Sequence, residues 1–259
     1  MRLARSALSV AAFAGAAVAV PAAACTPAAG YEVPTNLELV RAAETIVLAR
    51  VVGGTAASPA DPAGGSVVLR PVETLKGDLP QGDIPLSGMS LPVARGGMVS
   101  GYELSNPFEF ERAHEQAYAG ACIRTTFPLG TTAVFFLSRE ADGWAPAGGP
   151  FTRWAEDVPD AQAPWVQLVR LYTTAATLPG EDRVALFSNE REALMARRGE
   201  PLAQLMADDI ARQVMDSGEA AGAADAEGTA FEDAFRDPAS ESAVEASLRA
   251  MRQAATDSD

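Results

Sequence analysis

Few residues in this chain could carry out chemistry: it has two cysteines, Cys25 and Cys122, and a single histidine, His114. An even number of cysteines predicts a disulfide if the chain is exported to an oxidising compartment. A bridge between Cys25 and Cys122 would close a loop of nearly a hundred residues, which is worth about 4 to 5 kcal/mol on a chain-entropy model. A bridged Cys122 has no thiolate, so it cannot act as a nucleophile with His114 as its base.

His114 is the only imidazole that a mechanism could use. Glu109, Glu111 and Glu115 lie near it, and Glu111 and His114 have a helical spacing that some metal sites use. One histidine among carboxylates says little about a transition metal, because carboxylates cluster readily in an acidic chain. We therefore interpret this stretch as a solvated polar segment, and we expect no metal site and no cofactor. A hydrolase that depends on His114 is kept as an alternative.

The sequence lacks the motifs of common enzyme classes. It has no Gly-x-Ser-x-Gly elbow, no phosphate-binding glycine loop and no His-Glu-x-x-His zinc helix. The sequence therefore predicts a protein that is not an enzyme.

The residues before Cys25 have the layout of a secretory signal. Arg2 and Arg5 precede an uncharged apolar run over residues 6–20, and three alanines stand directly before the cysteine. The run is shorter than the roughly 20 apolar residues that a membrane helix needs. Residues 1–24 are interpreted as a signal peptide, and the mature chain as periplasmic or secreted.

A lipoprotein anchored through Cys25 is the alternative to a disulfide. Against it, Ala22 stands where lipoproteins usually carry a leucine-like residue. Acylation of Cys25 would also leave Cys122 as an odd thiol. The disulfide is therefore the favoured prediction.

Composition limits the partners of the chain. The formal net charge is −14, or −16 without Arg2 and Arg5, and Lys76 is the only lysine. An acidic, lysine-poor surface repels phosphate backbones and anionic membranes, which disfavours nucleic acid and lipid surfaces as partners. No later segment is apolar enough to span a membrane. Because nucleic acid and lipid surfaces are disfavoured, an unknown protein is the expected partner.

Local patterns predict the elements that must position the cysteines. Thr35 and Glu38 form a capping box, which predicts a short helix over residues 35–44. Pro71 predicts an edge position or a bulge in its strand. Apolar and alternating runs predict strands at 46–52, 66–75, 83–87 and 131–137, a hairpin closed by Trp144 and residues 151–154, and irregular segments at 53–65 and 88–106.

The chain changes character after Pro159. Pro164 suits the first position of a helix, whose apolar face holds Trp165, Leu168, Val169 and Tyr172. Two further helices are expected over residues 184–198 and 202–214. The acidic stretch from 217 to 259 is expected to be largely disordered, with a short helix over 242–253, and Arg153, Arg197 and Arg198 are expected to be surface charges.

These patterns resemble the netrin-like module of tissue inhibitors of metalloproteinases and of many secreted bacterial proteins. The resemblance covers residues 25–155. It rests on a cysteine at the mature terminus, a helix ending in Ala-Ala-Glu, the strands Ile-Val-Leu-Ala-Arg-Val and Val-Glu-Thr-Leu-Lys-Gly, and Cys122 with Phe-Pro-Leu-Gly at 127–130 and an apolar strand after it. It implies a five-stranded OB-type barrel with helices beside it.

The expected fold is α+β: a small antiparallel OB-type β-barrel with a short N-terminal helix, then an α-helical segment and a disordered acidic tail. The expected boundaries are 1–24 for the signal peptide, 25–155 for the barrel domain, 156–216 for the helical segment and 217–259 for the tail.

The expected function is a non-enzymatic binding or interaction module of the bacterial cell envelope. The resemblance implies an alternative, a metalloprotease inhibitor. In that family the amino group and carbonyl of a first-residue cysteine chelate the zinc of the protease, and the next side chain enters its specificity pocket. Cys25 and Thr26 would form this inhibitor edge, although Pro27 stands where those inhibitors have a second cysteine.

Overall fold

The computed structural model describes residues 25–216 except 59, 62–63, 79–81, 96–97, 100–102 and 142. The predicted signal peptide, the acidic tail and the helix expected over 242–253 lie outside the described residues. In chain order the elements are α1 (Asn36–Ala42), β1 (Thr45–Thr55), β2 (Ser66–Lys76), β3 (Ile84–Ser87), β4 (Ala94–Arg95), β5 (Met98–Val99), a 3₁₀ turn (Glu115–Tyr118), β6 (Thr132–Glu140), β7 (Gly143–Pro146), β8 (Ala155–Asp157), α2 (Pro164–Ala176), α3 (Gly180–Met195) and α4 (Pro201–Asp216).

The main sheet is antiparallel and has the strand order β3-β2-β1-β6-β7, with β8 also paired to β6. Strands β1, β2 and β3 form a meander, and β6 returns after a long connection to lie beside β1, which is a Greek-key arrangement. The sheet curls so far that its two edge strands, β3 and β7, contact each other. The α+β class and the curled antiparallel sheet are therefore as predicted.

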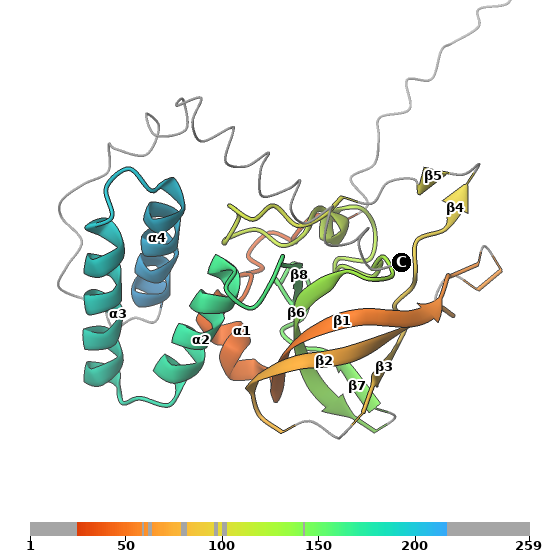
Figure 1. Cartoon of the computed structure of the whole chain (residues 1–259), viewed down its shortest axis with the longest axis horizontal. Helices are drawn as coiled ribbons and strands as arrows, with labels where there is room; N and C mark the ends of the chain where they lie inside the picture. Colours follow the sequence, from red (N-terminus) through yellow and green to blue (C-terminus); the bar gives the residue numbers. More distant parts are fainter. Residues whose placement is uncertain are drawn as a thin grey trace, which may run out of the picture.

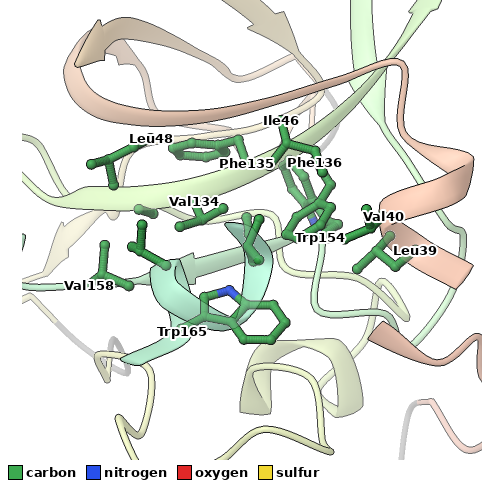
Figure 2. Close-up of a cluster of buried hydrophobic side chains, with 14 of the residues drawn as sticks. Leu39, Val40, Ile46, Leu48, Val134, Phe135, Phe136, Trp154, Val158 and Trp165 are labelled. Atoms are coloured by element: carbon green, nitrogen blue, oxygen red, sulfur yellow. The ribbon is translucent and has the colours of Figure 1, made fainter. Parts of the chain in front are cut away.

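The central strands are buried on both faces. Phe135 and Phe136 are consecutive in β6, so their side chains point to opposite sides of the sheet. The ring of Phe135 lies 5.4 Å from Phe127, and the ring of Phe136 lies 6.1 Å from Trp165 of α2. Figure 2 shows Trp165 on the side of Val134, away from Phe135. A strand covered on both faces has a continuous apolar sequence, which is why β1 and β6 could be predicted.

Pro71 lies beside a bulge, as its sequence predicts. The pairing of β1 with β2 changes register between Leu48, opposite Glu73, and Ala49, opposite Pro71. Val72 is the extra residue on β2, and its side chain is 60% exposed. Strand β3 pairs only with residues 66–69 of β2, so the missing N–H of Pro71 removes no bond to β3.

The helices follow the predicted order, and α2 joins them to the sheet. Pro164 is the first residue of α2, and Trp165, Leu168, Val169 and Tyr172 are all buried. Figure 1 shows α2 between the sheet and the antiparallel pair α3–α4. One continuous buried cluster contains apolar side chains from the sheet and from all four helices. No helix in the described ranges is long and apolar enough to cross a membrane.

Two predictions about the later strands differ from the structure. Strand β7 pairs with β6 as the expected hairpin around Trp144, but residues 151–154 do not form a strand. Phe151 has a left-handed backbone with φ +59°, which interrupts an extended ladder. The next strand is β8, which begins at Ala155. The expected irregular insertion at 88–106 contains the two short paired strands β4 and β5.

Candidate functional site

Cys25 and Cys122 form a disulfide that joins positions 97 residues apart, as predicted. Their Cα atoms lie 5.4 Å apart, within the range usual for a disulfide. Cys25 is buried against Ala113, Ala117 and Phe151. The disulfide occupies the sulfur atom to which a lipid would be attached in a lipoprotein, so one molecule cannot carry both modifications.

An exposed segment follows the disulfide. Residues 26–33, here called the N-terminal edge, connect Cys25 to helix α1 without belonging to a helix or strand. Thr26 and residues 28–33 are exposed, including the large apolar side chains of Tyr31 and Val33. The predicted inhibitor residue Thr26 is therefore at the surface, directly beside the buried Cys25.

Several contacts fix the conformation of the N-terminal edge. The N–H of Tyr31 donates to the carbonyl of Ala28 over 2.9 Å, which closes a turn with Gly30 at φ +82°. The Tyr31 hydroxyl donates to the carbonyl of Pro150 over 3.0 Å, and its ring packs edge-on against Phe151. The edge is therefore held at its start by the disulfide and near its end by Tyr31.

Pro34 and Thr35 separate the edge from helix α1, which begins with the predicted capping box. The Glu38 N–H donates to Thr35 Oγ1 over 3.2 Å, and the Thr35 N–H donates to the Glu38 carboxylate over 2.9 Å. The amide of Asn36 donates to the carbonyl of Phe110 and to the carboxylate of Asp209 in α4. The start of α1 is thus tied to the loop before the 3₁₀ turn and to α4.

A buried ionic cluster supports the loop that carries Cys122. Arg124 donates to both oxygens of Asp157 over 2.9 Å, and the two side chains are 1% and 3% exposed. The same carboxylate accepts from the N–H of Ser105 over 3.0 Å. The guanidinium of Arg124 also lies 4.4 Å from the centre of the Phe127 ring. These bonds connect three distant stretches of chain, and so fix the loop around residues 103–127 to strand β8.

His114 is buried beside this ionic cluster and does not lie at the surface. The prediction of a solvated polar segment is therefore wrong at this residue. His114 is 6% exposed, and its backbone N–H donates to Glu156 over 3.1 Å. Nε2 lies 2.8 Å from the carbonyl of Glu103, and Nδ1 accepts from the N–H of Gln116 over 3.2 Å. These partners define a neutral ring with its proton on Nε2. Burial, and then the nearby Arg124 charge, lower the pKa of His114.

The position of His114 does not favour hydrolysis. Both ring nitrogens already bind backbone groups, so neither is available to take a proton from a substrate. Of the neighbouring carboxylates, Glu109 accepts from the N–H groups of Glu111 and Arg112 and so caps a turn. Glu115 is exposed. No group of three His, Cys, Asp or Glu residues that could hold a metal occurs in the part of the chain that the structure describes.

Arg153 was expected at the surface and is instead buried, with 3% exposure. Its guanidinium lies 4.4 Å from the centre of the Trp165 ring and donates to the carbonyl of Arg112 over 3.0 Å. The carboxylate of Glu156, three residues later in β8, lies 4.0 Å from this guanidinium. Burial of Arg153 follows from the packing of α2 over the sheet, because Trp165 covers it. Arg197 and Arg198 are exposed, as expected.

The sequence pointed to the disulfide and to Thr26 but not to the residues that hold them in place. One signal was present: Arg153, Glu156 and Asp157 lie in a stretch where every residue from 151 to 158 is buried. Charges inside an apolar stretch are expected to be paired when they are buried. Comparisons of the chain with protein-family models, with curated proteins and with solved structures found no match.

Proposed function

We propose that this chain is a non-enzymatic interaction module of the cell envelope, which binds a protein partner through the N-terminal edge. The observation that carries the proposal is that residues 26–33 are exposed and at the same time fixed, by the Cys25–Cys122 disulfide and by Tyr31. A binding segment that is held in one conformation loses little entropy when it meets its partner. A disulfide persists in an oxidising compartment, which agrees with an exported mature chain.

The fold proposed for this module is an OB-type barrel. A five-stranded, partly open Greek-key barrel is the defining feature of that type. The strand order β3-β2-β1-β6-β7 and the contact between β3 and β7 support it. In this arrangement the sheet and its buried ionic cluster act as a rigid base, and the edge is the part that recognises the partner.

The chemistry of the edge favours a protein as the partner. It presents the aromatic ring of Tyr31 and the side chain of Val33, which are 39% and 38% exposed. Rigid aromatic side chains are enriched at protein interfaces, where they supply contact area at little entropic cost. The only acidic residue of the edge is Glu32, so its recognition does not depend on charge alone.

Site-specific photo-crosslinking in the native cell tests this proposal. A photoreactive residue at Thr26 or at Ala29 is expected to give one protein adduct, whereas the same residue at Val72 is the control. Val72 is an exposed apolar residue on β2, outside the edge. Val33→Asp should then lower the affinity of the purified partner at least tenfold, and Val72→Asp should not. Equal adducts from Val72, or no adduct from the edge, would contradict the proposal.

A metalloprotease inhibitor is the second candidate, favoured by one observation. Cys25 is held in a disulfide, and the next side chain, Thr26, is exposed. If cleavage occurs after Ala24, the free amino group of Cys25 would stand beside the exposed Thr26, as the inhibitor edge implies.

One added residue separates the two candidates. A mature chain with an extra alanine before Cys25 keeps its disulfide and Tyr31 but moves the free amino group away. Inhibition of zinc endoproteases by the natural mature chain, and its loss in the extended chain, would establish the inhibitor. An interaction module that uses Tyr31 and Val33 should bind its partner equally well in both forms. Intact-mass analysis of the native mature protein identifies its first residue and any lipid.

A further inference from the structure

The strained backbone of this protein is concentrated at the disulfide. Within the described ranges, Cys122 and Phe151 are the only residues other than glycine with a positive φ, at +60° and +59°. A bulky side chain rarely adopts this left-handed conformation. The two residues also contact each other, because the N–H of Phe151 donates to the carbonyl of Cys122 over 2.7 Å. Such a conformation persists only where the surrounding contacts force it, and it is typical of clamps and switch regions.

Both anchors of the N-terminal edge meet at this strained pair. The first anchor is the disulfide, which includes Cys122. The second is Tyr31, whose ring packs on Phe151 and whose hydroxyl donates to the carbonyl of Pro150. Cys25 itself is buried against Phe151. A change of backbone conformation at Cys122 and Phe151 would therefore release both anchors together.

The disulfide lies in a small apolar cluster of its own. The members of this cluster are Cys25, Ala113, Ala117, Tyr118, Cys122 and Phe151. None of these six residues belongs to the continuous buried cluster formed by the sheet and the four helices. Separate packing units of one protein can open with different free energies. The disulfide cluster can therefore open while the sheet stays folded.

We propose that oxidation of Cys25 and Cys122 is the switch that makes the N-terminal edge able to bind its partner. This inference rests on the proposed function of the edge. In the dithiol form the sheet is folded, the backbone at Cys122 and Phe151 relaxes, and residues 26–33 lose their fixed conformation. Formation of the disulfide fixes both anchors, so the edge takes up its binding conformation only in an oxidising compartment.

The chemical step is an exchange with a donor protein that carries a disulfide. The thiolate of Cys122 attacks one sulfur of the donor, which forms a mixed disulfide and releases the donor's other sulfur as a thiolate. The thiolate of Cys25 then attacks Sγ of Cys122, and the donor leaves as a dithiol. The chain loses two electrons and two protons, and the donor gains both. Cys122 follows the exposed residues 119–121, where a donor can reach it.

Nuclear magnetic resonance of the mature chain tests the switch without the need for a partner. On reduction with dithiothreitol, the amide signals of residues 26–33 and 148–152 should move to random-coil positions, whereas those of β1 and β6 should keep their shifts. Reoxidation with oxidised glutathione should restore the first spectrum. Unchanged signals from 26–33 would overturn the proposal, because packing alone would then fix the edge. Collapse of the β1 and β6 signals would also overturn it, because the whole fold would then depend on the disulfide.

Two variants separate the disulfide from the second anchor. Cys25→Ser/Cys122→Ser should reproduce the spectrum of the reduced parent and should not respond to dithiothreitol. Tyr31→Phe removes the bond to Pro150 but keeps the disulfide, so its oxidised form should keep dispersed signals for 26–33 and lose them on reduction. Random-coil signals from the edge of oxidised Tyr31→Phe would overturn the proposal, because the hydroxyl and not the disulfide would then fix the edge.

Crosslinking in the cell separates failure of the switch from failure of the proposed function. A photoreactive residue at Ala29 should give at least tenfold less adduct in Cys25→Ser/Cys122→Ser than in the parent, for equal amounts of the two proteins. Equal adducts would overturn the switch and leave the interaction module intact. Absence of adducts from both proteins, with an edge that is ordered only when oxidised, would contradict the interaction module and establish the dependence of the edge on oxidation.

Discussion

At the scale of single residues, the buried His114 should make stability depend on pH. Because burial lowers the pKa of His114 in the folded chain, the unfolded chain binds a proton more readily. In the unfolded chain the pKa of a histidine is about 6.5. The free energy of unfolding should therefore be highest above about pH 6.5 and should fall as the pH drops below this value. The contribution of one group has a limit of about 1.4 kcal/mol per pH unit. Urea unfolding at pH 7.5, 6.5 and 5.5 measures it.

The His114→Gln variant is the control, since its amide can still donate to Glu103 but does not titrate. The dependence on pH should be weaker in this variant than in the parent. Parallel losses of stability in both proteins would assign the effect to other groups. Retention of any hydrolytic activity by the variant would rule out His114 as a catalyst.

The Arg124–Asp157 pair provides a second prediction at this scale. Arg124→Met leaves the buried Asp157 carboxylate without its cation, and such a loss typically costs about 3 to 5 kcal/mol. The double variant Arg124→Met/Asp157→Asn should be more stable than the single one, because a neutral amide can still accept from Ser105. Denaturant unfolding with the disulfide intact gives both values. A double variant no more stable than Arg124→Met would show that charge compensation is not the role of the pair.

At the scale of the elements, Lys76 at the end of β2 caps helix α1. Its ammonium group donates to the carbonyls of Val40, Arg41 and Ala43 over 2.6, 3.3 and 2.5 Å. Carbonyls at the end of a helix lack partners inside the helix and favour a cation. Lys76→Met should therefore lower the free energy of unfolding by about 1.5 to 3 kcal/mol, on typical values for hydrogen bonds to charged groups.

Arg70→Met is the matched control for Lys76 on the same strand. Arg70 forms an exposed ion pair with Asp83, and exposed pairs contribute little. Its denaturation midpoint should stay close to that of the parent. Equal destabilisation by the two substitutions would mean that loss of a cation from β2, and not loss of the helix cap, determines the effect.

At the scale of the whole molecule, the disulfide joins Cys25, the first described residue, to the loop before β6. Closing a loop of this length should stabilise the chain by about 4 to 5 kcal/mol relative to the reduced form. Urea unfolding of the parent with and without reductant, and of Cys25→Ser/Cys122→Ser, measures the difference. The reduced parent and the double variant should have the same midpoint. No change on reduction would mean that packing around Phe151 alone fixes the edge.

Much of the fold could be predicted because its signals are local. The capping box of Thr35 and Glu38 defines the start of α1, and Pro164 defines the start of α2. Strands β1 and β6 are visible as apolar runs because both of their faces are buried. The Cys25–Cys122 pair was predictable because the chain has only two cysteines.

The sequence by itself thus determined the helices, the long strands β1, β2 and β6, and which cysteines pair. Only the tertiary structure decided which charged residues are buried and that residues 26–33 are fixed. Arg124 meets Asp157 across 33 residues, and Asn36 meets Asp209 across 173. Helix caps and apolar runs depend on neighbouring residues, whereas the pairing of a buried charge depends on a partner that only folding brings near.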